Sequence, residues 1–324
     1  MRLKFILLFL LCLCFFWADI CVGSVTLSVS ELLDKQSDIL WQIRLPKALT
    51  ALFVGSTLAS SGLLMQTLFR NPLAGPYVLG ISSGATLGVA VFLLLFYLLG
   101  ISMAFFQWGI ILFGIIGAFG LMAFILLISL RVNDSVTLLV AGMMLGGVSS
   151  SIVNILQHLS DAHHVKYFVN WTLGSLANVT WEQLEILCPI LTITILLSLF
   201  LLKSMDVLLL GEEYAQSVGV KVSRLRFQII LVTVIQTALC TAFAGPIGFV
   251  GIAVPHVTRR LFDTSRHRVI LPACLLLGSS MMLLCDLLSH LPSNGYVLPI
   301  NAVTSLMGIP IVLWIIFGRT KMVV

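Results

Sequence analysis

Charge is scarce in this sequence. Of its 324 residues, 10% are Asp, Glu, Lys or Arg and 59% are hydrophobic, whereas soluble domains carry about 25% charged residues. Residues 71–130 contain no Asp, Glu, Lys, Arg or His, and about 20 apolar residues suffice for one membrane-spanning helix. The shortage of charge therefore excludes a soluble enzyme, a nucleic-acid-binding domain and a disordered chain.

Ionisable residues are also rare inside the apolar runs, where Asp286 is the main exception. Such residues usually mark proton or ion relays, so their scarcity disfavours an ion-coupled secondary transporter.

Motifs for catalysis, metal binding and nucleotide binding are missing. None of the seven cysteines forms a CxxC pair or has the spacing of metal ligands, which favours small buried hydrophobic residues. There is no HExxH, no GxSxG and no glycine-rich loop ending in Lys-Ser or Lys-Thr. We expect a chain that is not an enzyme, with no catalytic residue, metal or cofactor, and any ATP-driven work requires a partner.

The apolar runs that are present predict an all-α, polytopic integral membrane protein with about ten transmembrane helices. Residues 1–324 would form a single transmembrane domain, with no room for a separate soluble one. The eighth span is short, which suits a broken or re-entrant segment. The spans are expected near residues 4–23, 48–69, 78–100, 105–130, 135–158, 186–202, 227–246, 248–261, 269–290 and 298–317.

The basic residues predict the orientation. With both termini in the cytoplasm, all but four of the 18 Lys and Arg residues lie inside, as the positive-inside rule requires. The outside set is Lys35, Arg44, Lys47 and Lys166. The first apolar run could be a cleaved signal peptide or lipoprotein leader, but its length of about 19 residues favours a retained span.

Two Gly-Pro breaks, Gly75-Pro76 and Gly245-Pro246, fall at opposite ends of their predicted spans. That placement is typical of an inverted repeat relating spans two to five to spans seven to ten. Gly and Pro are common in membrane helices, so coincidence explains the similarity equally simply.

Three polar stretches stand out: RLPK at 44–47 with RNPLA at 70–74, GEEYAQSVGV at 211–220, and GFVGIAVPHVTRR at 248–260. They resemble the signature stretches of the FecCD-type permease family, which imports ferric siderophores, haem and cobalamin. The resemblance extends from Trp41 to Gly318. It implies the permease subunit of an ATP-binding-cassette importer in a bacterial inner membrane.

The family resemblance also implies partners and a cargo. Members form homodimers, are driven by two cytoplasmic ATPase subunits, and receive cargo from a periplasmic or lipid-anchored binding protein. An iron chelate, ferric siderophore or haem, is the first expectation and cobalamin the second. An ion-coupled secondary transporter is the rival class.

The resemblance assigns three sets of residues. An ATPase-coupling loop contains a short helix that begins at acidic residues and ends at a glycine C-cap. An ordinary solvated loop is the alternative. The coupling residues are Glu212, Glu213, Tyr214, Ala215 and Gly219.

Binding-protein docking is expected at three exposed positions, Arg44, Lys47 and His290. Arg44 and Lys47 are permanently charged, whereas His290 gains its charge on acidification. Contact with lipid headgroups is the alternative for Arg44 and Lys47. The family usually has Arg at the position of His290. It usually has an acid and a glycine where this chain has Val297 and Asn301.

The cytoplasmic gate is expected at Leu73, Val136 and Thr137, although Leu73 could equally pack a helix end. His158, His163 and His164 lie near the outer end of span five. Histidine can ligate haem iron, but ordinary polar loop residues are the favoured interpretation.

Overall fold

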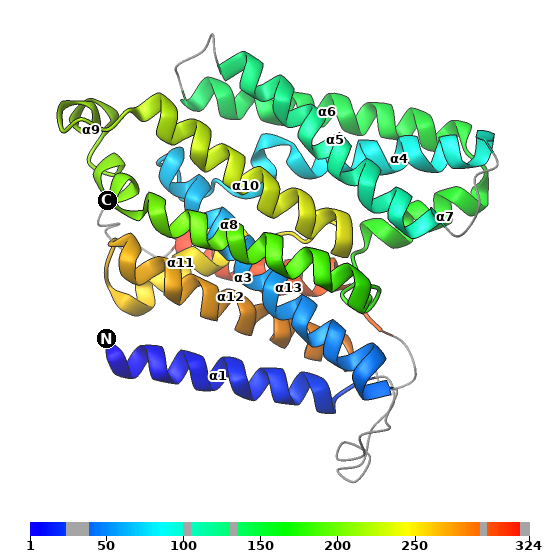
Figure 1. Ribbon diagram of the computed structural model, residues 1–324, viewed down its shortest axis with the longest axis horizontal. Helices are drawn as coiled ribbons and strands as arrows, with labels where there is room; N and C mark the ends of the chain where they lie inside the picture. The colour runs from blue at the N-terminus through cyan, green and yellow to red at the C-terminus, as the bar shows by residue number, and fades with distance from the viewer. Residues whose placement is uncertain (24–38, 100–104, 130–134, 292–296, 318–324) are drawn as a thin grey trace.

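The computed structural model describes residues 1–23, 39–99, 105–129, 135–291 and 297–317, and every regular element within these ranges is helical. A π-helical turn, Leu40–Arg44, runs directly into α3, and a 3₁₀ turn, Pro76–Leu79, precedes α4. The helices are α1 (Arg2–Cys21), α3 (Leu45–Leu68), α4 (Ile81–Leu99), α5 (Phe106–Ser129), α6 (Ser135–Leu159), α7 (Ala162–Thr172), α8 (Trp181–Leu208), α9 (Glu212–Ser217), α10 (Val222–Ala244), α11 (Val250–Phe262), α12 (His267–Ser289) and α13 (Ile300–Phe317) (Figure 1).

Seven of the described segments are long and apolar enough to span a membrane. They belong to α1, the π turn with α3, α5, α6, α8, α10 and α12. Shorter apolar stretches lie in α4 and α13. The expected all-helical, multi-pass architecture is confirmed, and the count of ten spans stays a prediction.

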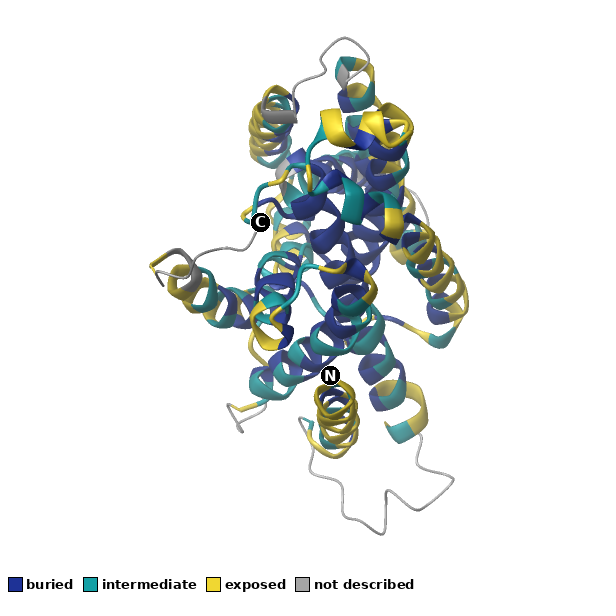
Figure 2. Ribbon diagram, turned by 90° about the vertical axis from the view of Figure 1, so that its left-hand side faces the viewer, coloured by how far each residue is buried: buried dark blue, intermediate teal, exposed yellow. Residues whose placement is uncertain are grey.

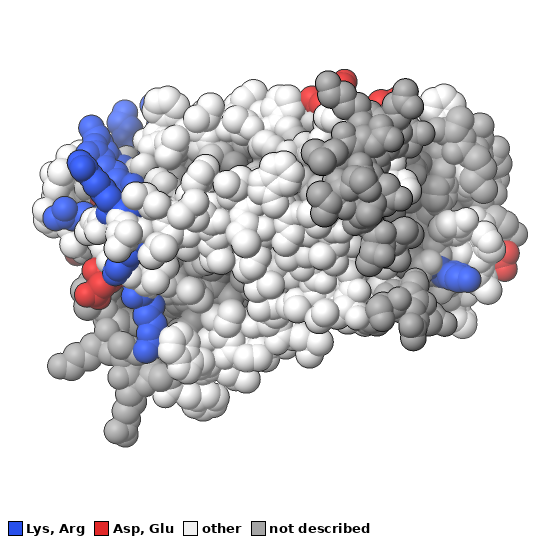
Figure 3. All heavy atoms as spheres, turned by 90° about the horizontal axis from the view of Figure 1, so that it is seen from below, with Lys and Arg blue, Asp and Glu red and all other residues white. Residues whose placement is uncertain are grey.

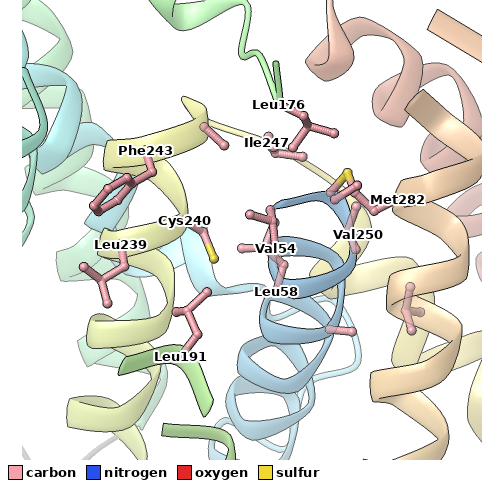
Figure 4. Close-up of a cluster of buried hydrophobic side chains, with 14 of the residues drawn as sticks. Val54, Leu58, Leu176, Leu191, Leu239, Cys240, Phe243, Ile247, Val250 and Met282 are labelled. Atoms are coloured by element: carbon pink, nitrogen blue, oxygen red, sulfur yellow. The ribbon is translucent and has the colours of Figure 1, made fainter. Parts of the chain in front are cut away.

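Helix α3 lies at the centre of the bundle, where 83% of its most apolar stretch is buried. It packs against α8, α10, α11 and α12, and Figure 4 shows Val54 and Leu58 of α3 facing Cys240 of α10 and Met282 of α12. Glycine permits the closest approach, because a Cβ on Gly62 would overlap the backbone of Gly251. Small residues at helix contacts are typical of membrane proteins.

In contrast to α3, the outer helices leave most of their apolar stretches unburied. The most apolar stretches of α1, α5, α6 and α8 are only 22%, 28%, 28% and 33% buried. Figure 2 shows exposed residues on the outer helices around a buried centre. Apolar faces of this extent are compatible with lipid or a second membrane protein, and not with water.

The bundle has two chemically different ends. One, which we call the basic end, holds the beginning of α1, the end of α11 and the end of α13. There Lys4 Nζ donates to the Leu261 carbonyl at 2.8 Å, and the Arg260 guanidinium lies 3.8 Å from the Trp314 ring. Figure 3 shows Lys and Arg gathered at that end. The beginning of α1 and the end of α13 therefore lie at the same end of the bundle.

Several helix boundaries differ from those expected from the sequence. The helix expected from residue 48 already begins at Leu40, so Arg44 and Lys47 are helical. Helix α8 begins at Trp181, earlier than expected, because Thr180 and Gln183 form a capping box. Helix α7 was not expected, and Asp161 caps it by accepting from the Ala162 N–H.

Candidate functional site

Helix α9 projects from the basic end (Figure 1). The Gly219 N–H donates to the Gln216 carbonyl and the Val220 N–H to the Ala215 carbonyl, both at 2.9 Å, with Gly219 at a φ of 93°. This is a Schellman ending. The sequence-based prediction of a short helix that begins at the acidic residues and ends at Gly219 is confirmed.

Helix α9 is attached by some side chains and displays others. Ala215 is buried, and the Arg226 guanidinium of α10 donates to a Glu212 carboxylate oxygen at 2.9 Å. Glu213 and Tyr214 are exposed. A small acidic and aromatic surface is thus held rigidly where a second protein can reach it.

The segment 71–75 joins α3 to the turn before α4, also at the basic end. Leu73 is 43% exposed, and its N–H donates to Asn71 Oδ1 at 2.9 Å. Thr137, near the beginning of α6, is exposed. The side chain of Val136 lies outside the described part of the chain. Leu73 is available to contact another chain, and its role as a gate stays a prediction.

Helix α11 contacts this segment and α3 through polar side chains. His256 Nε2 lies 2.6 Å from the Pro72 carbonyl oxygen. Arg259 donates to Gln66 Oε1 at 2.6 Å, and Gln66 Nε2 donates to the Ile252 carbonyl at 3.2 Å. The sequence alone does not predict these contacts, because they join residues more than 180 positions apart.

A second junction joins α3, α8 and α12 at the same end. His267 lies between the Thr67 hydroxyl, 2.8 Å from its Nε2, and Asp206 Oδ1, 2.6 Å from its Nδ1. The His267 backbone N–H also donates to Asp206. Since His267 is only 1% exposed and Thr67 is fully buried, the arrangement fixes helix ends and has no opening for a substrate.

The opposite end contains a buried charge cluster of Asp19, Lys47, Asp286 and His290. Lys47 Nζ lies 2.6 Å from Asp286 Oδ2, 3.4 Å from Asp19 Oδ1 and 3.1 Å from His290 Nε2. Arg44 donates to the carbonyls of Ile20 and Cys21, both at 2.7 Å. These contacts tie the end of α1 to α3 and α12.

The expectation that Arg44, Lys47 and His290 present exposed charges is wrong. Arg44 and Lys47 are each 4% exposed, and the His290 side chain is 10% exposed. The reason is the early start of α3, which places both basic side chains against α1. Asp19 was missed because an acid within the first apolar run has no sequence signal for its partner.

The remaining sequence candidates have local contacts. His163 packs edge-on against Tyr167 with ring centroids 5.0 Å apart, and His158 is exposed at the end of α6. Asn301 Oδ1 accepts from the Gly248 N–H at 3.1 Å, so this departure from the family pattern joins α13 to the turn before α11. Val297 is exposed. In the described ranges no three His, Cys, Asp or Glu side chains converge as metal ligands.

The helices of the bundle are long enough to span a membrane, its surface is compatible with lipid, and a short helix projects at one end. These features define a multi-pass membrane protein of the permease class. The chain belongs to the FecCD transport family, which it matches over residues 6–318.

Known relatives agree with this family. The chain is 35% identical to the vitamin B12 import system permease protein BtuC of Klebsiella pneumoniae over 92% of this chain and 88% of that protein. It is 33% identical to the hemin transport system permease protein HmuU of Yersinia pestis, with 93% and 91% covered. It is 35% identical to the molybdate import system permease protein MolB of Haemophilus influenzae, with 85% and 80% covered.

A solved structure is similar over nearly the whole fold. An inward-facing conformation of a metal-chelate type ABC transporter matches with a TM-score of 0.88 at 31% identity, covering 99% of this chain and 100% of that one.

Proposed function

We propose that this chain is the membrane-spanning subunit of an ATP-binding-cassette importer and works as a homodimer. Two cytoplasmic ATPase subunits would drive it, and a binding protein would deliver the cargo at the opposite end. The observation that carries the proposal is α9, a capped helix held by Glu212 and Ala215 with Glu213 and Tyr214 exposed. The sequence itself has no nucleotide-binding motif, so ATP hydrolysis belongs to the partner.

The proposed orientation follows from the charges. The basic end would face the cytoplasm of a bacterium, with both chain termini, because Lys and Arg concentrate on the cytoplasmic side of inner-membrane proteins. Helices α4, α11 and α13, which are shorter than the seven long segments, would complete ten crossings. Helix α9 then meets the cytoplasmic ATPase.

Helix α6 supports a dimer with a central path. Its exposed face carries Gly147, Ser151, Asn154 and His158, which lie three or four positions apart and therefore form one stripe. The Ser151 hydroxyl donates to the Gly147 carbonyl at 3.0 Å, but the Asn154 amide and the His158 imidazole would be costly to expose to lipid. We therefore place this stripe against a water-filled path between two copies rather than against hydrocarbon.

For the cargo we propose an iron chelate, a ferric siderophore or haem, with cobalamin as the second candidate. The similarity to a hemin permease and to a metal-chelate transporter supports the first, and the similarity to BtuC supports the second. The test is uptake of labelled haem, ferric siderophores, cobalamin and molybdate by a deletion strain with and without this gene. Restored uptake of molybdate alone would contradict the proposed cargo.

An ion-coupled carrier is the rival. In the described residues, the buried charged side chains and histidines lie toward the two ends, and the buried polar side chains between them on α3 and α10 are neutral, such as Ser60, Thr233 and Gln236. The rival predicts uptake that a protonophore stops while ATP is maintained. The importer predicts uptake that persists under those conditions and stops when the ATPase partner is inactivated.

A further inference from the structure

The segment that carries Leu73 is held to α11 by one short hydrogen bond. His256 Nε2 lies 2.6 Å from the carbonyl oxygen of Pro72, the residue directly before Leu73. A carbonyl oxygen only accepts, so His256 Nε2 carries the proton and donates it. His256 is 8% exposed, and a buried donor with this geometry resists replacement by water.

Helix α11 is itself firmly fixed to α3, so it is a rigid support. Gln66 bridges the two helices, because it donates to the Ile252 carbonyl and accepts from Arg259. One turn earlier on α3, Gly62 lies against the backbone of Gly251, with no room for a Cβ. The support therefore does not move independently of the bundle centre.

The beginning of α11 is fixed from the other side by α13. Phe249 has a φ of 66°, which is unusual for a residue with a side chain. Its Cβ packs where a Cβ on Gly308 would lie, and the neighbouring Gly248 N–H donates to Asn301. The strained turn is thus stabilised by α13.

By contrast, the contacts of the 71–75 segment with α11 are few. The Leu73 N–H bonds within the segment, to Asn71 Oδ1. The Leu73 side chain is exposed. The side chain of Ile252 packs at Gly75, two residues further on. The Asn71 N–H donates to the Gln66 carbonyl of α3 at 3.2 Å, and Ala74 is buried. Between these anchors, the hydrogen bond from His256 joins the residue before Leu73 to α11.

We propose that His256 is a positioning residue that holds the 71–75 segment against α11 and so fixes the Leu73 side chain at the mouth of the path. This inference rests on the proposed importer function and on the gate role that the family resemblance predicts for Leu73. Through His256, the position of Leu73 is tied to α11, which is itself held by α3 and α13. His256 touches neither cargo nor nucleotide in this account.

The test compares two amides at one position. In H256Q the amide nitrogen replaces Nε2 and reaches Pro72, whereas in H256N the shorter side chain does not. A nitroxide on L73C reports the mobility of the segment, with exposed Cys14 and Cys21 and half-buried Cys188 replaced by Ala. H163N is the matched control, because His163 lies on α7 and is exposed. The spectra are recorded on the full-length permease in lipid nanodiscs.

We expect H256N to raise the mobile fraction of the label about fivefold, the factor given by loss of one ordinary hydrogen bond, while H256Q and H163N match the parent. Equal mobility in H256N and the parent would overturn the proposal. A rise in the mobile fraction in H256Q equal to that in H256N would also overturn it, because such a rise would mean that both substitutions disturb α11 as a whole. If H256N does not assemble, H256M replaces it, with a similar volume and no donor.

A second readout separates this proposal from the proposed function. With Leu73 native and the ATPase bound, H256N should raise leak of a small dye through proteoliposomes, and H256Q should restore the parent level. A mobile segment without added leak would overturn the link from His256 to a gate at Leu73. Cargo uptake by the complex of unmodified permease and ATPase is measured separately. If that complex takes up no cargo, the proposed importer function fails. The positioning role of His256 is judged only by the label mobility and the dye leak.

Discussion

At the scale of single residues, Lys47 links the buried charges at the end of the bundle that lies opposite the basic end. Its ammonium group contacts carboxylates from two helices, Asp19 of α1 and Asp286 of α12. Burying a charge is costly unless it is paired. Arg44 donates to the last carbonyls of α1, so these contacts together attach α1 to the bundle.

Replacing Lys47 by Met should therefore be strongly destabilising. Two buried carboxylates would lose their counter-ion, and breaking a buried pair costs about 3–5 kcal/mol. The measurement is the unfolding midpoint in mild detergent, with K166M, at an exposed position of α7, as control. A midpoint in K47M equal to that of K166M would contradict the account, and D19N combined with K47M should recover part of the loss.

His290 predicts the direction of a pH effect. It follows the last residue of α12, where burial and the charges of Lys47 and Arg44 lower its pKa, while Asp286 raises it. A lowered pKa favours the neutral form in the folded state, so stability should fall as the pH drops below the unfolded value of about 6.5.

The pH prediction is measured as the unfolding midpoint between pH 7.5 and 5.5 in the parent and in H290Q. The parent should lose stability on acidification, and H290Q should lose less, so the difference between the two variants isolates the contribution of His290. An identical pH dependence in H290Q would contradict the role given to His290. The sequence alone predicts a charge on His290 that appears on acidification, and the lowered pKa moves that charging to a lower pH.

At the scale of helices, the sequence predicted what is encoded locally. The helix at α9 and its end at Gly219 follow from acidic residues and a nearby glycine, and both signals lie within eight positions. The early start of the helix was not predicted, because in the sequence Arg44 and Lys47 look like charged residues that precede a membrane span. Only their contact partners show that they belong to the helix. Those partners lie 23 to 243 positions away in the sequence.

The close contact between α3 and α11 depends on glycine. A G62A variant must push the two backbones apart, since a Cβ there would overlap Gly251, and overpacking typically costs about 1–3 kcal/mol or more. We expect a lower unfolding midpoint and a weaker contact between Gln66 and Arg259. G120A is the matched control, because a Cβ on Gly120 of α5 meets nothing within 4 Å. Equal midpoints in G62A and G120A would argue against this packing.

At the scale of the whole molecule, the exposed faces separate lipid from the proposed path. Ser151 of α6 lies on the polar stripe, whereas Ile116 of α5 is exposed among apolar residues. In membranes, S151C should react with a water-soluble maleimide and I116C should not, because only the first would face water. The measurement is the labelled fraction in vesicles from cells, in variants without Cys14 and Cys21. Equal labelling of the two sites would contradict the placement of α6.

The central claim is that α9 couples this permease to an ATPase, and its most direct test is association with that ATPase. The double variant E213K/Y214A changes the two exposed side chains of α9 and leaves the Glu212–Arg226 pair intact. E185K is the control for charge reversal, because Glu185 is exposed near the beginning of α8, away from α9. The measurement is co-purification of the ATPase subunit with the solubilised permease. The account predicts loss in E213K/Y214A with dimerisation retained and no loss in E185K, and full co-purification of the ATPase with E213K/Y214A would contradict it.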